Sequence, residues 1–255
     1  MGLLDGKIGL IAGVANENSL AWHCAKTWHE NGADLIFTCK EHRLDKVLDL
    51  VSTLDDSYPV IPCDAESDDD IYDLFTEISD RYSKLDIFLH SIAAAPKAVF
   101  DEPFTSVSRD DFMTAFNASV YSFIAMSREA SLLMSDGGSI MTISYIGAEK
   151  VVPVYNIMGP AKAALEASVK YVANDFGSDG IRVNAISSGP VPTLAARSIP
   201  GFRDILERDA DVAPLARNVT GSDIGSVSLF LASDLSKGIT GEIIHVDCGA
   251  NLIIS

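Results

Sequence analysis

Cysteine is scarce in this sequence, and its cysteines lie far apart. The 255 residues include four of them, Cys24, Cys39, Cys63 and Cys248, and no two form a CxxC pair. Structural zinc sites use closely spaced cysteine or histidine ligands. We therefore expect no metal site. Isolated cysteines of this kind are most often buried, reduced thiols.

Basic residues are also few. The chain has 19 Lys and Arg against 36 Asp and Glu, which gives a net charge of −17. Nucleic acids and anionic membrane surfaces bind basic faces, so neither is expected as a partner. No apolar run is long enough to span a bilayer. The first residues, MGLLDGKIGLIAG, lack the features of a secretion signal, so we expect a protein of the cytoplasm.

Short apolar segments alternate along the chain with longer amphipathic ones. Seven segments predict strands: KIGLIAG, ADLIFTC, YPVIPC, LDIFLHSIA, GSIMTISYI, IRVNAISSG and EIIHVDCG. Most are apolar on both faces, which is typical of a parallel sheet covered by helices on each side. Helical patterns such as SLAWHCAKTWHENG and DDDIYDLFTEISDRY lie between them. The alternation predicts an α/β fold, a Rossmann-like doubly wound sheet of about seven parallel strands, in one domain over residues 1–255.

The turn after the first predicted strand, GVANENSLAW, lies where doubly wound sheets bind nucleotides. It is not a GxGxxG motif, because only Gly13 is a glycine. Ser19 instead opens the next helix, whose free N–H groups and positive dipole end suit a pyrophosphate. Serine is also a common helix cap, and from this turn alone the capping role is favoured.

Two further strand ends carry weak signals of the same kind. Asp64 follows the third predicted strand, where its carboxylate could accept the adenine amino group or simply cap a helix. The fourth strand ends in HSIA, whose small residues would let a flat ring and a ribose approach the backbone. The order of these signals along the alternating pattern favours a dinucleotide site.

The segment YNIMGPAK places a phenol, Tyr155, seven residues before an amine, Lys162. Seven residues return a helix to nearly the same face, so both side chains can face one ligand if the segment between them is helical or nearly so. Pro160 costs little within a first helical turn. We therefore expect the helix to begin near Ile157 or Met158, with Tyr155 just outside it.

These residues belong to a longer pattern that resembles the bacterial enoyl-acyl-carrier-protein reductases of the short-chain dehydrogenase/reductase superfamily. The likeness runs from about Lys7 to Gly249. It rests on Gly13-x5-Ser19, on HSIA, on SYIGAEKVVPVYNIMGPAKAALEA and on RVNAISSGPVPTLAA. The Tyr-x6-Lys spacing separates these reductases from ordinary dehydrogenases of the superfamily, which use Tyr-x3-Lys.

The resemblance implies a homotetramer that reduces a trans-2-enoyl thioester on acyl carrier protein with a nicotinamide cofactor, in fatty-acid elongation. It implies catalytic roles for Tyr155, Lys162 and Tyr145, and a substrate-covering lid near residues 193–208. The implied cofactor contacts are Gly13, Ser19, Leu20, Lys40, Asp64, Ala65, Ile92, Lys162 and Thr193. The implied substrate contacts are Ala95, Tyr145 and Met158.

The end of the second strand bears on the choice of cofactor. It reads Thr38-Cys39-Lys40-Glu41, with no acidic residue at its tip to bind a ribose 2′-OH. Lys40 and Arg43 could accept the 2′-phosphate of NADPH, whereas Glu41 would repel it. We expect NADH, with NADPH left open.

Two other functions stay open at this point. An ordinary NAD(P)-dependent short-chain alcohol dehydrogenase or ketoreductase would carry lysine four residues after the tyrosine, but that position is Gly159. A catalytically silent nucleotide-binding regulator would be expected to lose Tyr155 or Lys162, and both are present.

Overall fold

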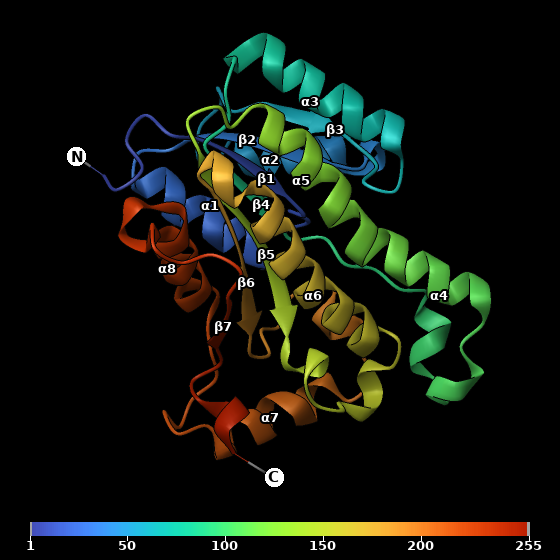
Figure 1. The fold of residues 1–255 in the computed structure, drawn as a ribbon. Helices are drawn as coiled ribbons and strands as arrows, with labels where there is room; N and C mark the ends of the chain where they lie inside the picture. Colours follow the sequence, from blue (N-terminus) through green and yellow to red (C-terminus); the bar gives the residue numbers. More distant parts are fainter. Residues whose placement is uncertain (1, 254–255) are drawn as a thin grey trace.

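Seven parallel strands form one sheet in the computed structural model, which describes residues 2–253 (Figure 1). The strands are β1 (Ile8–Ala12), β2 (Asp34–Cys39), β3 (Val60–Pro62), β4 (Ile87–His90), β5 (Gly138–Tyr145), β6 (Ile181–Ser188) and β7 (Ile243–Val246). All seven predicted strands and the α/β class are thus confirmed. Met1, Ile254 and Ser255, which the predicted domain includes, lie outside the described residues.

The strand order is β3-β2-β1-β4-β5-β6-β7, so the chain reverses its direction of growth between β1 and β4. Leu10 in β1 lies opposite Ile36 of β2 on one side and Phe88 of β4 on the other. The chain first builds outward from β1 to β3, then returns to place β4 beside β1. Doubly wound sheets bind ligands at such a switch point, beyond the carboxyl ends of the strands.

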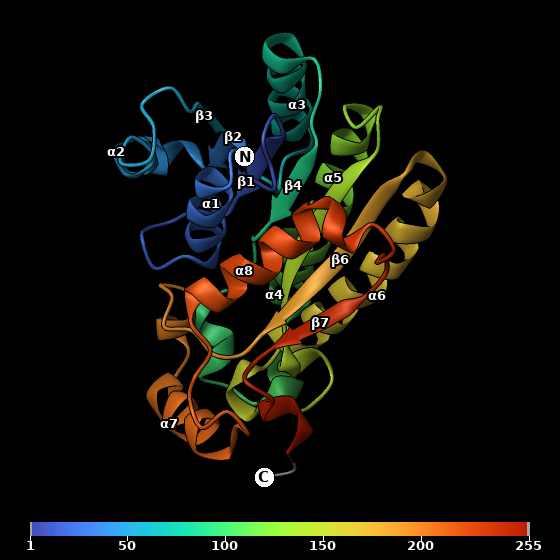
Figure 2. The same cartoon turned by 90° about the vertical axis from the view of Figure 1, so that its left-hand side faces the viewer.

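Helices cover both faces of the sheet, as strands that are apolar on both faces require (Figure 2). One face packs against α1 (Leu20–Glu30), α2 (Leu44–Val51) and α8 (Gly221–Ala232). The other packs against α3 (Asp68–Tyr82), α5 (Ser122–Leu132) and α6 (Met158–Phe176). Each face therefore has its own apolar core.

Two helices lie outside these layers or lead into them. The helix α4 (Arg109–Phe116) runs into α5 through a π-helical turn, Asn117–Tyr121. The helix α7 (Phe202–Val212) lies beyond the carboxyl ends of β5 and β6. In Figure 1 the arrowheads of these two strands point toward the side of the sheet where α7 lies. None of the helices within residues 2–253 has the length and apolar character needed to cross a membrane.

The contact between α1 and α8 contains a buried polar pair. A Cβ at Gly225 would approach Thr27 Oγ1 to 2.5 Å, so the two helices lie close together there. Beside this contact the indole N–H of Trp28 donates to Ser228 Oγ at 3.0 Å. Both side chains are fully buried. The indole N–H therefore depends on this one hydroxyl for its partner.

Replacing Ser228 by alanine should destabilise the protein, because the buried indole N–H of Trp28 would lose its acceptor. We expect the free energy of unfolding to fall by about 1–3 kcal/mol. Ser226→Ala, on the exposed side of the same helix, should change it by less than about 0.5 kcal/mol. Urea denaturation of both variants is the measurement, and equal effects at the two positions would contradict the prediction.

Candidate active site

The turn after β1 touches the segment that follows β4. Gly13 has a φ of +106°, and a Cβ there would lie 2.1 Å from the carbonyl oxygen of Ser91, so only glycine fits. The N–H of Ser91 in turn donates to the carbonyl of Ala12 at 2.9 Å. The two loops of the switch point are therefore held against each other through their backbones.

Ser19 is the N-cap residue of α1 by position, but its side chain makes no capping bond to the helix. Its Oγ instead accepts hydrogen bonds from the N–H groups of Ala15 and Asn16, at 3.0 and 3.1 Å. Ser19 thus orders the turn itself. The N–H groups of Leu20 and Ala21, at the start of α1, have no acceptor among the described residues, and a helix start of this kind suits an anion.

Lys40, which follows β2, lies between two carboxylates that follow β3. Its Nζ is 2.9 Å from Asp64 and 2.8 Å from Glu66. Partial burial opposes the positive charge, but hydrogen bonds to Glu66 and Asp64 outweigh it and raise the pKa of Lys40. Ala65, between the two acids, is buried in the core. The charge of Lys40 is therefore already balanced within the protein.

Two tyrosines meet where β5 ends and the chain enters α6. The ring centroids of Tyr145 and Tyr155 are 4.9 Å apart in an edge-to-face arrangement. Gly147 permits this contact, since a Cβ there would lie 2.6 Å from the ring of Tyr155. Burial raises the pKa of Tyr145 to about 12, with a further contribution from Asp209, and burial also raises the pKa of Tyr155. Both phenols therefore stay protonated at neutral pH and can donate hydrogen bonds.

The helix α6 begins at Met158, and Tyr155 lies in a 3-10 turn just before it, both as predicted. Pro160 falls in the first turn of the helix, as predicted, where a proline costs little. Asn156 has a φ of 45° and interrupts the helical path. The segment from Tyr155 to Lys162 is thus helical only in its second part, and the helical spacing argument holds only from Met158 onward.

Lys162 is buried, and its Nζ donates to the carbonyl of Ile143 near the end of β5, at 2.7 Å. Burial lowers the pKa of Lys162 to about 8, against the opposite effect of Glu166 one helical turn later. Glu166 is held by Ser144, whose hydroxyl donates to it at 2.5 Å. At neutral pH Lys162 therefore places a mostly positive charge beside the strand that carries Tyr145.

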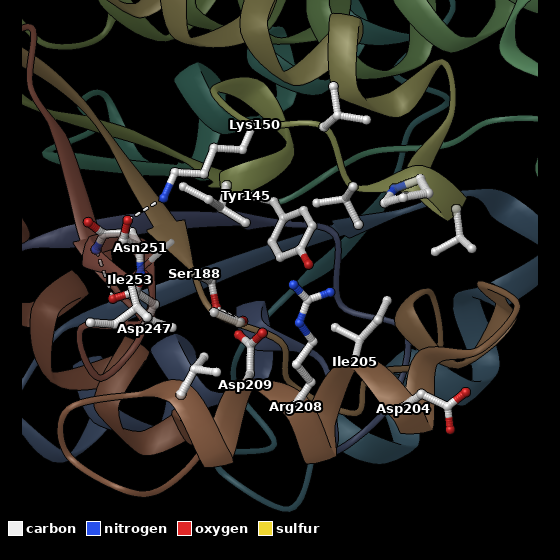
Figure 3. A pocket seen from close by; sticks show the side chains of 18 of the residues that line it. Tyr145, Lys150, Ser188, Asp204, Ile205, Arg208, Asp209, Asp247, Asn251 and Ile253 are labelled. Atoms are coloured by element: carbon white, nitrogen blue, oxygen red, sulfur yellow. Dashed lines mark hydrogen bonds between the residues drawn. The ribbon is translucent and has the colours of Figure 1, made fainter. Parts of the chain in front are cut away.

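A cavity of about 340 Å³, lined by Tyr145 but not by Tyr155, lies between the strand ends and α7 (Figure 3). Its polar lining includes Tyr145, Ser188, Asp204, Arg208, Asp209 and Asp247. In Figure 3 the guanidinium group of Arg208 points toward the hydroxyl of Tyr145. The predicted lid, residues 193–208, comprises a 3-10 turn and the first part of α7, and no residue of α7 is buried.

The remaining predicted contacts lie around these groups. Ala95 and Tyr155 pack against one apolar cluster of Val99, Ala115, Ile157 and Met158. Met158 is buried there and does not line the cavity of Figure 3. Ile92 packs against the larger core, and Thr193 Oγ1 accepts from the N–H of Ala196 at 3.1 Å.

The structure brings Tyr145, Tyr155 and Lys162 to one end of the site. It leaves Lys40, Asp64 and Ala65 at the other end, beyond β2 and β3. Sequence reasoning missed Gly147, Glu166 and Asp209. The spacing of Glu166, four residues after Lys162, could have placed it on the same helix face, whereas Gly147 and Asp209 carry no local signal.

Comparisons with known proteins cover nearly the whole chain. The family model described as "Enoyl-(Acyl carrier protein) reductase" matches residues 13–251. A protein of Aquifex aeolicus named enoyl-[acyl-carrier-protein] reductase [NADH] FabI is 47% identical over 99% of this chain and 94% of its own length. A protein of the same name from Rickettsia typhi is 46% identical over 98% of this chain and 96% of its own length.

Solved structures agree with the sequence relatives. The Bacillus cereus enoyl-acyl carrier protein reductase, solved with NADP+ and indole naphthyridinone, superposes with a TM-score of 0.98 at 44% identity and covers all of both chains. The Anaplasma phagocytophilum enzyme, solved with NAD, has a TM-score of 0.96 at 43% identity and covers 100% of this chain and 97% of its own. This chain belongs to the enoyl-acyl-carrier-protein reductase family.

Proposed function

We propose that the protein reduces the trans-2 double bond of enoyl thioesters on acyl carrier protein, with NADH as reductant, in fatty-acid elongation. The observation that carries the proposal is the pair of protonated tyrosines, Tyr145 and Tyr155, beside the buried cation Lys162. The relatives named as NADH-dependent enoyl reductases, at 43–47% identity, support the substrate and the cofactor.

The residues along the carboxyl edge of the sheet suit an extended dinucleotide. The open start of α1 fits a pyrophosphate. Gly13 lets the loop after β4 lie against this turn, because a Cβ at Gly13 would meet the carbonyl of Ser91. We assign Gly13, Ser19 and Leu20 to the pyrophosphate part. The adenosine end would then meet Lys40, Asp64 and Ala65, and the nicotinamide end would meet Ile92, Lys162 and Thr193. When bound, the reduced nicotinamide supplies the hydride that adds to the β-carbon of the substrate.

Tyr155 stabilises the charge that this addition leaves on the thioester oxygen. Its protonated phenol donates a hydrogen bond to that oxygen, as a donor in an oxyanion hole does. The same group can pass on a proton. Tyr145 holds the ring of Tyr155 by its edge-to-face contact, and Lys162 holds the ribose hydroxyls and provides a fixed positive charge near the developing negative one. Ala95 and Met158 form the apolar side of the substrate site.

The remaining parts of the proposal concern assembly and partner. We infer that residues 193–208 cover the acyl chain and that the enzyme is a cytoplasmic homotetramer of single-domain subunits. Met113 on α4 is 60% exposed and Tyr171 on α6 is 76% exposed. Large exposed apolar side chains on neighbouring helices support an interface with a second copy of the chain.

An assay with a crotonyl thioester and NADH, following the loss of reduced nicotinamide absorbance, tests the proposal directly. Turnover of the enoyl substrate is the expected result. Turnover of a keto substrate alone would favour an ordinary ketoreductase, and cofactor binding without turnover would favour a silent regulator.

Tyr155→Phe should lower kcat by about 10²–10³-fold, because it removes one oxyanion donor. Cofactor affinity should be unchanged, since the phenyl ring and Lys162 remain. The matched control is Tyr72→Phe, which removes a hydroxyl from an exposed tyrosine on α3 and should leave kcat unchanged. Steady-state kinetics and fluorescence titration with NADH measure both quantities, and wild-type turnover in Tyr155→Phe would refute the role.

The lowered pKa of Lys162 predicts a pH dependence of cofactor binding. Below its pKa of about 8 the amine carries the charge that holds the ribose, and that charge is lost as the pH rises through this value. The affinity for NADH should therefore fall across pH 8. The Lys162→Ala variant should bind NADH more weakly, and its affinity should not change across pH 8. Titrations on both sides of pH 8 decide it, and the same pH dependence in both proteins would exclude Lys162 as its cause.

The carboxylates around Lys40 predict the preference for NADH. Glu66→Gln would leave Lys40 with less compensating charge and make it available to the 2′-phosphate of NADPH. We expect kcat/KM for NADPH relative to NADH to rise several-fold. Glu77→Gln, which breaks an exposed pair with Arg81 on α3, is the control and should not change the ratio. No shift with Glu66→Gln would show that Lys40 plays no part in the choice.

A further inference from the structure

The segment that follows β4, residues 91–96, carries two of the residues assigned to cofactor and substrate, Ile92 and Ala95. Its first residue is tied to β1 by the bond from Ser91 to Ala12. Among the described residues, Ala94 is the only member of positions 92–95 that forms a hydrogen bond, and Pro96 accepts one only from Val99 in the turn that follows. The conformation of this part of the site therefore depends on what holds Ala94.

Ser119 holds both backbone groups of Ala94. Its Oγ accepts from the N–H of Ala94 at 3.2 Å and donates to the C=O of Ala94 at 3.3 Å. The side chain of Ser119 is completely buried. One hydroxyl that donates and accepts on the same residue limits both the position and the rotation of that residue.

The π-helical turn between α4 and α5 presents this hydroxyl to the sheet. Ser119 is the central residue of that turn, Asn117–Tyr121, and π-turns inside helices occur often at functional sites. Three residues later the Oγ of Ser122 lies 2.9 Å from Nε2 of His90, the last residue of β4. Two buried serines thus contact the end of β4 and the segment that follows it.

We propose that Ser119 is a positioning residue for catalysis: it holds residues 91–96 in the conformation that accepts the nicotinamide and the enoyl chain. The proposal rests on the proposed function for its kinetic part. Ala95 packs against the apolar cluster that Tyr155 also contacts, so a displacement of Ala94 would reach the wall of the site directly. If residues 91–96 are already ordered, less conformational entropy is lost when the ligands bind. Loss of the Ser119 hydroxyl should therefore raise KM more than it lowers kcat.

Ser127 provides a matched control on the neighbouring helix. It lies in α5, is also completely buried, and its Oγ has no hydrogen-bond partner among the described residues. Replacing Ser127 by alanine therefore breaks no hydrogen bond and should cause no loss of hydrogen-bond energy. Ser119→Ala and Ser127→Ala therefore make the same chemical change in similar surroundings, and only the first removes a bond to the site.

The test combines amide exchange with kinetics on the full-length protein. In Ser119→Ala the amide of Ala94 should exchange faster, and KM for both NADH and the crotonyl thioester should rise by roughly tenfold, the effect of one lost buried hydrogen bond. The change in kcat should be smaller. Ser127→Ala should match the wild type in the exchange rate of the Ala94 amide, in both KM values and in kcat. Ser119→Cys keeps the size of the side chain but forms weaker hydrogen bonds, so its values should lie between those of the wild type and Ser119→Ala.

Unchanged exchange at Ala94, unchanged KM values, or equal changes in Ser127→Ala would each overturn the proposal. If Ser119→Ala does not fold, Ser119→Cys carries the same comparison. A wild-type protein that does not reduce the crotonyl thioester would refute the proposed function instead. The exchange at Ala94 requires no turnover, so it would still report whether Ser119 holds the segment.

Discussion

Gly13 and Ser91 bring two loops into backbone contact at the point where the strand order reverses, and the rest of the site is arranged around that contact. The close approach is possible only because residue 13 has no side chain and adopts a positive φ. On one side of it Ser19 orders the turn before α1. On the other side residues 91–96 follow β4 and reach the hydroxyl of Ser119. A displacement of either loop would therefore alter both the nucleotide side and the reaction side.

Burial sets the charge of the reaction groups in opposite senses. The same removal from water raises the pKa of the tyrosine phenols and lowers that of the Lys162 amine, because it disfavours the charged form in each case. The phenols therefore stay neutral donors, and the lysine keeps its charge only up to about pH 8. Lys40 lies at the other end of the site, where it is more exposed, and its charge is set by Asp64 and Glu66 instead.

The net charge of −17 does not predict how the charged groups of the site are arranged. Three positive groups of the site have neighbours within the protein: Lys40 lies between two carboxylates, Lys162 Nζ donates to a carbonyl, and Arg208 points toward Tyr145 in the cavity of Figure 3. The overall field repels anions, so a nucleotide must be held by groups that it meets only at the switch point. Backbone N–H groups at a helix start serve this purpose without adding a basic surface.

The sequence by itself determined the elements and their order. Strands apolar on both faces are recognisable because that pattern is local, and the seven predicted strands appear in the sheet. The start of α6 was predictable for the same reason, since Pro160 restricts the backbone wherever it occurs. The pairing of Tyr155 with Lys162 came from spacing and from resemblance to a family.

Tertiary structure alone decided how these residues meet. The carboxylates around Lys40 follow from packing between segments distant in sequence. The side-chain amide of Asn156, whose positive φ interrupts the helix, likewise donates to the carbonyl of Glu102, 54 positions away. Gly147 accommodates the ring of Tyr155 only because β5 and α6 converge there. Ser119 contacts Ala94, 25 positions away, through a helical turn whose width no periodicity reveals. Local pattern specifies which elements form, whereas their contacts depend on strand register and on how closely the helices approach the sheet.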